Sequence, residues 1–181
     1  GMPYNPDLEI SAFNVLPAGQ GGGTAASFAS DLCVVTQDIT DDEAVDMSRA
    51  EAAVLFDVNN KEVLYSKNAH ERLYPASLTK VMTALVALQN GSLEQVLTAT
   101  NAVNITESGA QLCGVESGDT MTLDQALHIL LMYSANDVGM MIAENIGGSV
   151  ERFVEMMNEE ALRLGATNTH FMNPHGLSDD E

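Results

Sequence analysis

The chain is poor in basic residues. Only 7 Lys and Arg stand against 26 Asp and Glu, which gives a formal net charge of −19 at pH 7 and a pI near 4.2. Because so acidic a surface repels phosphate backbones, the composition argues against a nucleic-acid partner. Long apolar runs are also missing, and no stretch approaches the roughly 18 apolar residues of a membrane-spanning helix.

Patterns that bind metals are missing as well. The two cysteines, Cys33 and Cys113, form no Cys-x-x-Cys, and the four histidines lack a ligand spacing such as His-Glu-x-x-His. We therefore expect no metal and no cofactor. The cysteines can pair in an exported protein or remain as small buried hydrophobes, and we favour the second. Among the histidines, His128 lies in an apolar run and is predicted to pack within a helix, whereas His170 and His175 are predicted to lie in a surface turn.

The first fifty residues differ from the rest. They carry several prolines, the run Gly21-Gly22-Gly23 and many small residues, a composition typical of a flexible linker. Two short apolar pieces, 10–16 and 32–35, could each add a strand. We therefore predict that 1–50 form an acidic linker or docking arm, and that 51–181 form part of one folded domain. The acidic patch of this arm comprises Asp38, Asp41, Asp42, Glu43 and Asp46.

The folded part is predicted to begin with a β-hairpin. Apolar residues alternate over 54–58 and again over 63–65, and Asn59-Asn60 between them can adopt the positive φ of a tight turn. An amphipathic helix follows this hairpin. Its apolar face recurs at three- and four-residue steps and comprises Leu78, Val81, Met82, Leu85 and Leu88.

Ser77 and Lys80 lie at the start of this helix. Pro75 prevents helix upstream, and the spacing of three places both side chains on one helical face. The helix dipole favours a developing alkoxide on Ser77, and a lysine whose pKa is depressed by burial can take the serine proton. The same residue types also fit an ordinary helix cap and an ordinary surface lysine.

Three further helices are predicted downstream. Thr122 to Gln125 form a helix-start signature, and 123–133 is nearly all apolar, which is typical of a buried helix. Helices over 137–146 and 149–165 follow, the last with Phe153, Met156, Met157 and Leu162 as its buried stripe. Ser134-Ala135-Asn136 therefore lies in the joint between two buried helices, where polar side chains need partners.

A Ser-x-x-Lys followed by a Ser-x-Asn is the motif order of penicillin-binding proteins and class A β-lactamases. Ser-x-Asn alone is a weak signal, since Ser66-Lys67-Asn68 also fits it. Residues 51–177 closely resemble the serine-type D-alanyl-D-alanine carboxypeptidases, which are low-molecular-weight penicillin-binding proteins of peptidoglycan. The segments that carry the likeness are Tyr74–Lys80, Ser134–Asp137, Ala143–Gly148 and Asn168–Leu177.

The resemblance implies an α+β, β-lactamase-like fold, of which this chain holds the leading hairpin and the helical subdomain. It implies that Ser77 attacks the carbonyl of a terminal D-Ala-D-Ala bond in a peptidoglycan stem peptide, with Lys80 as general base. Ser134 would relay the proton to the leaving amine, and Asn136 would hold the substrate amide and Lys80. β-Lactams would acylate the same serine, and the protein would work outside the cytoplasm.

The chain departs from this family in one respect. None of Lys61, Lys67 and Lys80 begins a Lys-Thr-Gly motif. In the family this motif lies on a later strand that helps to bind the substrate carboxylate and supplies an oxyanion-hole N–H group. We therefore expect 51–181 to be the N-terminal portion of such a domain, which pairs with a missing C-terminal part or with a second copy of itself.

Two alternative functions remain open. A β-lactamase is disfavoured because no Glu-x-x-Leu-Asn, the segment that would carry a deacylating glutamate, follows Ser134. A catalytically inactive module of the same fold, which would recognise wall peptide or mediate assembly, is consistent with the missing third motif.

Overall fold

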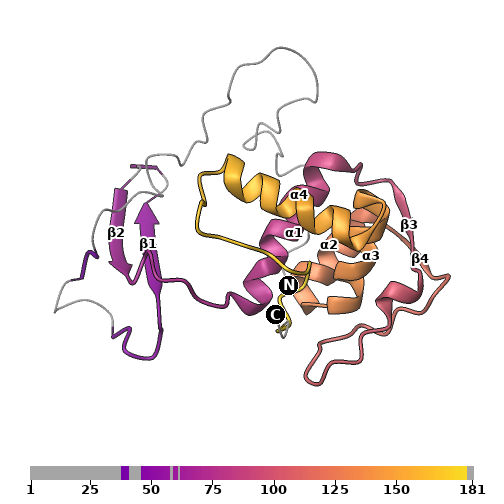
Figure 1. Cartoon of the computed structure of the whole chain (residues 1–181), viewed down its shortest axis with the longest axis horizontal. Helices are drawn as coiled ribbons and strands as arrows, with labels where there is room; N and C mark the ends of the chain where they lie inside the picture. Colours follow the sequence, from indigo (N-terminus) through magenta and orange to yellow (C-terminus); the bar gives the residue numbers. More distant parts are fainter. Residues whose placement is uncertain (1–37, 41–45, 58, 61, 179–181) are drawn as a thin grey trace, which may run out of the picture.

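The computed structural model describes residues 38–40, 46–57, 59, 60 and 62–178. The strands expected over 10–16 and 32–35, the glycine run and Cys33 lie outside the described residues. Figure 1 shows a two-stranded hairpin on one side of the molecule and a cluster of helices on the other. This mixture of strands and helices is the α+β arrangement that the sequence predicted.

The hairpin consists of β1 (Ala53–Asp57) and β2 (Glu62–Lys67), paired antiparallel with a register shift between Leu55 and Phe56. The Asp57 carboxylate accepts hydrogen bonds from the backbone N–H groups of Asn59 and Asn60, and so stabilises the predicted turn. Part of the predicted arm contacts the hairpin, because Ile39 forms a β-bridge with Ser66. The domain boundary near residue 50 stays a prediction.

Four helices make up the helical cluster: α1 (Thr79–Asn90), α2 (Leu123–His128), α3 (Asn136–Gly147) and α4 (Val150–Arg163). The predicted starts are confirmed, since Thr122 forms a capping box with Gln125 and the Ser149 hydroxyl accepts from the N–H of Arg152. The short strands β3 (Val96–Thr98) and β4 (Thr120–Thr122) pair antiparallel beside the helices. The described residues also form two 3₁₀ turns, η2 (Ala76–Leu78) and η3 (Asn101–Val103).

The buried core lies among these helices and β3. Its largest fully buried side chains are Phe153, Leu97, Leu123, Leu130, Met141, Ile142 and Met157. The segment after α4 returns to α1 and contacts its first turns, as Figure 1 shows near the C-terminus. Within the described part of the chain, no helix is long and apolar enough to cross a membrane.

The helix predicted after Pro75 is confirmed, but its apolar face is not the buried one. Leu78, Val81 and Leu88 are 73%, 61% and 46% exposed. The buried face instead carries small and polar residues, which allow α3, α4 and the 174–176 segment to approach closely. Among the described residues, nothing fully covers Leu78, Val81 and Leu88, whereas Met82 is partly buried against the core. The buried residues of α1 are Thr79, Lys80, Thr83, Ala84, Val86 and Ala87.

The prediction of one buried helix over 123–133 is wrong in its second half. α2 ends at His128 and continues as a π-helical turn, η4 (Ile129–Tyr133), in which Met132 is 82% exposed. His128 is exposed rather than packed inside, because its ring faces Asp124 at the surface. Two further predictions are wrong: Leu162 lies on the exposed side of α4, and Cys113 is an exposed free thiol rather than a buried hydrophobe.

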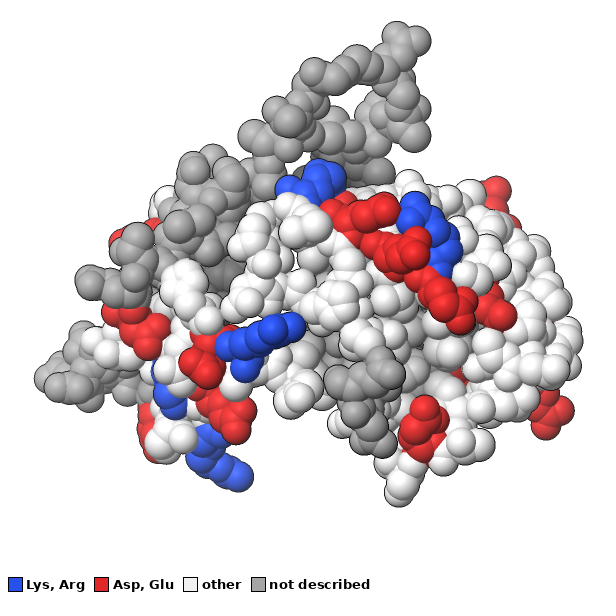
Figure 2. Space-filling view, in the orientation of Figure 1, with Lys and Arg blue, Asp and Glu red and all other residues white. Residues whose placement is uncertain are grey.

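Charged side chains are unevenly distributed over the face drawn in Figure 2, where they gather over α4 and over the hairpin. On α4 they form ion pairs between Arg152 and both Glu155 and Glu159, and between Arg163 and Glu160. The area between these two groups is largely uncharged in this view.

Candidate active site

Ser77 and Lys80 lie side by side at the head of α1. The Lys80 Nζ donates a hydrogen bond to the Ser77 Oγ at 3.1 Å. Ser77 lies in η2, the 3₁₀ turn that leads into the helix, and its side chain is exposed, whereas Lys80 is 2% exposed. The predicted arrangement of an accessible hydroxyl above a buried amine is therefore present in the structure.

A backbone carbonyl holds the amine from the other side. The Lys80 Nζ donates to the carbonyl oxygen of His175 at 2.8 Å, a contact across 95 residues of sequence. Burial lowers the pKa of Lys80 below its ordinary value of 10.5. This shift favours the neutral amine that a general base requires, and the contact with the His175 carbonyl fixes the position of the amine.

Ser134 completes a chain of three polar groups. Its Oγ donates to the Ser77 Oγ at 3.0 Å, so that the Ser77 oxygen receives hydrogen bonds from both Lys80 and Ser134. Ser134 directly follows η4 and adopts the left-handed conformation with φ 62°. Residues 57 positions apart in sequence are thus brought together, as the family resemblance implied.

Asn136 is placed beside this group but makes a different contact. It is 3% exposed at the first position of α3, and its backbone N–H donates to the Gln111 carbonyl at 2.8 Å. Among the hydrogen bonds of the described residues, none joins the Asn136 side chain to Lys80. The expectation that Asn136 holds both the substrate and Lys80 stays a prediction.

The 173–177 segment is the part of the site that the sequence did not reveal. His175 was predicted to lie in a surface turn, yet it is 94% buried (6% exposed) and seats Lys80 through its carbonyl. The Asn173 side chain shapes the turn by accepting from the N–H of Gly176 at 2.7 Å, and the Pro174 carbonyl accepts from the Thr83 hydroxyl at 2.6 Å. Because Lys80 and Thr83 donate to backbone carbonyls, side-chain patterns could not signal these two contacts.

Two of the three described non-glycine residues with positive φ lie at the hydrogen-bonded hydroxyls of Ser77 and Ser134, and the third, Asn68, follows the hairpin. Ala76, directly before Ser77, has φ 47°, and Ser134 has φ 62°. A residue other than glycine in such a conformation costs on the order of 1–3 kcal/mol, and such strain clusters at functional sites. The rest of the fold therefore holds both hydroxyls in place against local preference.

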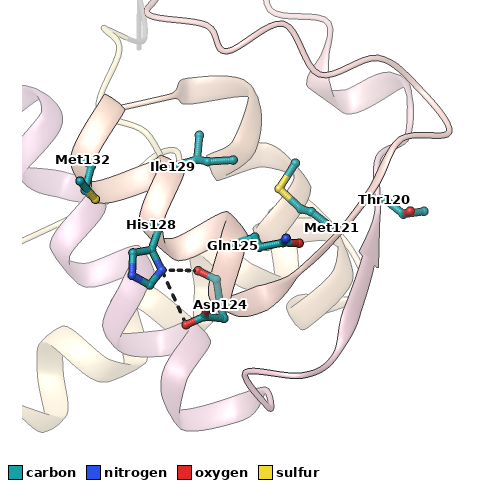
Figure 3. A pocket seen from close by; sticks show the side chains of 7 residues that line it. All are labelled: Thr120, Met121, Asp124, Gln125, His128, Ile129 and Met132. Atoms are coloured by element: carbon teal, nitrogen blue, oxygen red, sulfur yellow. Dashed lines mark hydrogen bonds and ion pairs between the residues drawn. The ribbon is translucent and has the colours of Figure 1, made fainter. Parts of the chain in front are cut away.

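A wide hollow elsewhere on the surface contains none of these groups. It has a volume of about 780 Å³, and Figure 3 shows its lining side chains, with the His128 ring directed at two oxygens of Asp124. Met132 and Ile129 give it an apolar wall. No group of three potential metal ligands occurs among the residues that the structure describes. The hollow is therefore lined by residues other than Ser77, Lys80 and Ser134.

Comparison with known proteins agrees with this geometry. The family model described as D-alanyl-D-alanine carboxypeptidase matches residues 37–181. The chain belongs to this family. The D-alanyl-D-alanine carboxypeptidase DacF of Bacillus subtilis is 41% identical to it over 137 residues, which cover 72% of this chain and 34% of the relative.

Solved structures of this carboxypeptidase family share the fold. The carboxypeptidase DacD of Francisella tularensis superposes with a TM-score of 0.69 at 31% identity, over 81% of this chain and 36% of that one. Penicillin-binding protein D2 of Listeria monocytogenes, in its cefotaxime-bound form, gives a TM-score of 0.61 at 28% identity, over 72% and 54%. The chain spans about a third of the length of the curated relatives that it matches.

Proposed function

We propose that this carboxypeptidase removes the terminal D-alanine from peptidoglycan stem peptides that end in D-Ala-D-Ala, through an acyl-enzyme on Ser77. The observation that carries the proposal is the chain of hydrogen bonds from Lys80 and Ser134 to one serine oxygen. Membership of the family supports the choice of substrate. Such peptides lie outside the cytoplasmic membrane, so we place the protein there.

In the proposed reaction the Ser77 oxygen attacks the carbonyl carbon of the D-Ala-D-Ala peptide bond, and the neutral Lys80 amine accepts the hydroxyl proton. The tetrahedral intermediate then collapses. Its C–N bond breaks, and the proton passes through Ser134 to the leaving amine of D-alanine. Water attacks the remaining ester, with Lys80 as base, and releases the shortened peptide and free Ser77. Asn136 orients the substrate amide during these steps.

β-Lactams should react with the same serine because their strained amide resembles this peptide bond. Support for this comes from the family relative whose structure carries bound cefotaxime. The test is to incubate the complete gene product with labelled penicillin and follow the intact mass. We expect a stable adduct on Ser77 that is absent from Ser77→Ala. Rapid hydrolysis of the drug would instead favour a β-lactamase, and no labelling would favour an inactive module.

The exposed apolar face of α1 is also part of this proposal. Leu78, Val81 and Leu88 are apolar yet open to solvent, and the curated relatives possess more chain than is present here. We propose that the remaining portion of the family domain covers this face. The 181-residue chain alone should then associate in size-exclusion chromatography, and Val81→Glu with Leu88→Glu should return it to its mass of 19.3 kDa. A monodisperse, active unsubstituted monomer would contradict the proposal.

A further inference from the structure

Asp137 is a buried carboxylate that the proposed reaction does not use. It is 1% exposed and lies at the second position of α3, three residues after Ser134. Its Oδ2 accepts hydrogen bonds from three successive backbone N–H groups, which belong to Cys113 at 3.1 Å, Gly114 at 2.8 Å and Val115 at 3.1 Å. Its Oδ1 accepts from Cys113 at 3.1 Å and from Val138 at 3.0 Å.

The three N–H groups form an anion nest. Successive backbone N–H groups converge on one point when a residue among them adopts a left-handed conformation, and Gly114 does so with φ +87°. Such concavities bind phosphates and other anions in many proteins. Here a carboxylate of the same chain fills the nest, and hydrogen bonds to an ionised acceptor are stronger than those between neutral groups.

The nest ties a surface loop to the reactive centre. The loop is joined to α3 a second time where the Asn136 N–H donates to the Gln111 carbonyl at 2.8 Å. Residues 111–115 are therefore fixed to the first turn of α3, directly after Ser134, whose hydroxyl bonds to Ser77. Loss of the carboxylate would remove the acceptor of four N–H groups, three in the loop and that of Val138, and would leave the loop held by fewer contacts.

We propose that Asp137 is a positioning residue, which by filling this nest fixes the 111–115 loop as a wall beside Ser134 and Asn136 and so aligns bound substrate. This inference rests on the proposed acylation of Ser77. Asp137 exchanges no proton in it and touches no reacting atom. A displacement of about 1 Å in such a support can cost on the order of 10²-fold in rate.

The test uses Asp137→Ala in the complete gene product. We expect the second-order rate of penicillin acylation, corrected for the folded fraction, to fall about 10- to 100-fold. Sodium formate, compared with sodium chloride at equal ionic strength, should restore part of the rate because formate can occupy the vacated nest. A residue that served stability alone would give no anion-specific rescue.

A second readout does not depend on acylation. Two effects raise the pKa of the Cys113 thiol: burial has the larger effect, and the charge of Asp137 has the next largest. In a Cys33→Ser background, Asp137→Ala should therefore increase the rate of iodoacetamide alkylation at Cys113 severalfold at pH 7.5, and formate should slow it again. If wild type is not acylated at Ser77, the proposed function fails, while the thiol measurement still reports on the nest.

Glu160→Ala is the matched control. Glu160 is also a buried carboxylate, 6% exposed, but it is bonded to Arg163 and Gln89 at the opposite end of α1. The Glu160→Ala substitution should lower the melting temperature without changing the acylation rate, the rate of Cys113 alkylation or the response to formate. The proposal is overturned if Asp137→Ala is acylated at the wild-type rate, or if its rate falls while neither the thiol nor formate responds.

Discussion

Lys80→Arg is expected to lower the rate at which penicillin acylates Ser77 by about 10²- to 10⁴-fold, the usual contribution of a general base. Arginine keeps a positive charge and could still donate to the His175 carbonyl, which accepts from Lys80 at 2.8 Å in wild type. It stays protonated at all accessible pH values, however, and cannot take the serine proton. The rate constant is measured from the growth of the acylated mass.

The pH dependence of the acylation rate should also change in Lys80→Arg. Because burial lowers the pKa of Lys80 from 10.5, the neutral amine forms at lower pH than in a free lysine. The wild-type rate should therefore rise with pH along an acid limb whose midpoint lies below 10.5. In Lys80→Arg this limb should vanish. A limb that persists would assign the proton acceptor to another group.

Lys67→Arg serves as the control for this substitution. The Lys67 Nζ also donates to two backbone carbonyls, those of Met47 and Ala50, but it does so at the hairpin. Its replacement should leave the acylation rate and the acid limb unchanged. Equal losses in both variants would mean that the chain depends on lysine for folding and would contradict a specific role of Lys80.

The stability of the folded protein should also depend on pH because the pKa of Lys80 differs between the folded and the unfolded state. In the unfolded chain the Lys80 amine keeps its ordinary pKa, whereas in the folded protein its pKa is lowered. At pH values between these two pKa values, the unfolded state therefore binds more protons than the folded state. Stability should therefore rise with pH across that window. Thermal melts of wild type and Lys80→Met at several pH values would reveal it, because the substitution removes this contribution. A parallel pH dependence in both proteins would contradict the assignment.

Local patterns predicted the parts of the site that depend on one element or on a short turn. The three-residue spacing of Ser77 and Lys80 fixes their contact within one helical turn, whichever face of the helix is buried. The caps at Thr122 and Ser149 are equally local, so both helix starts were correct. The break between two apolar segments placed Ser134 at a helix joint, whereas its contact with Ser77 was implied only by the family resemblance.

Features that depend on distant contacts were not predictable in this way. The apolar face of α1 is exposed because burial depends on what covers a face and not on its periodicity. The surface position predicted for His175 was wrong because this residue contacts Lys80 through a backbone carbonyl, which every residue possesses. The nest around Asp137 joins a side chain on α3 to amide groups more than twenty residues earlier, and residue types do not record such pairings.

Gly176→Ala is expected to remove most of the acylation activity by displacing the His175 carbonyl, which accepts a hydrogen bond from Lys80. Gly176 has φ +84°, and a Cβ there would lie 1.9 Å from the Ala76 carbonyl oxygen and 2.9 Å from the Thr79 hydroxyl. Because the nearest atoms belong to the backbone of Ala76, no rotation of a side chain can relieve this clash. The 173–177 segment must therefore move away from α1, and Lys80 then loses its acceptor, the His175 carbonyl.

The expected loss in acylation rate is at least about 10²-fold, as for other displaced catalytic groups. Stability should fall as well. The carbonyls of Pro174 and His175 lose their donors, which costs about 1–3 kcal/mol for each buried group left unpaired. Chemical denaturation measures the stability, and the acylated mass per folded molecule measures the rate.

Gly165→Ala separates the clash from the backbone strain. Gly165 has nearly the same φ, +83°, yet a Cβ there meets nothing within 4 Å. Its substitution should cost only the left-handed penalty of about 1–2 kcal/mol and should leave acylation unchanged. If Gly176→Ala behaved like Gly165→Ala in both measurements, the close approach to Ala76 would not be what holds Lys80, and a different contact would have to fix the base.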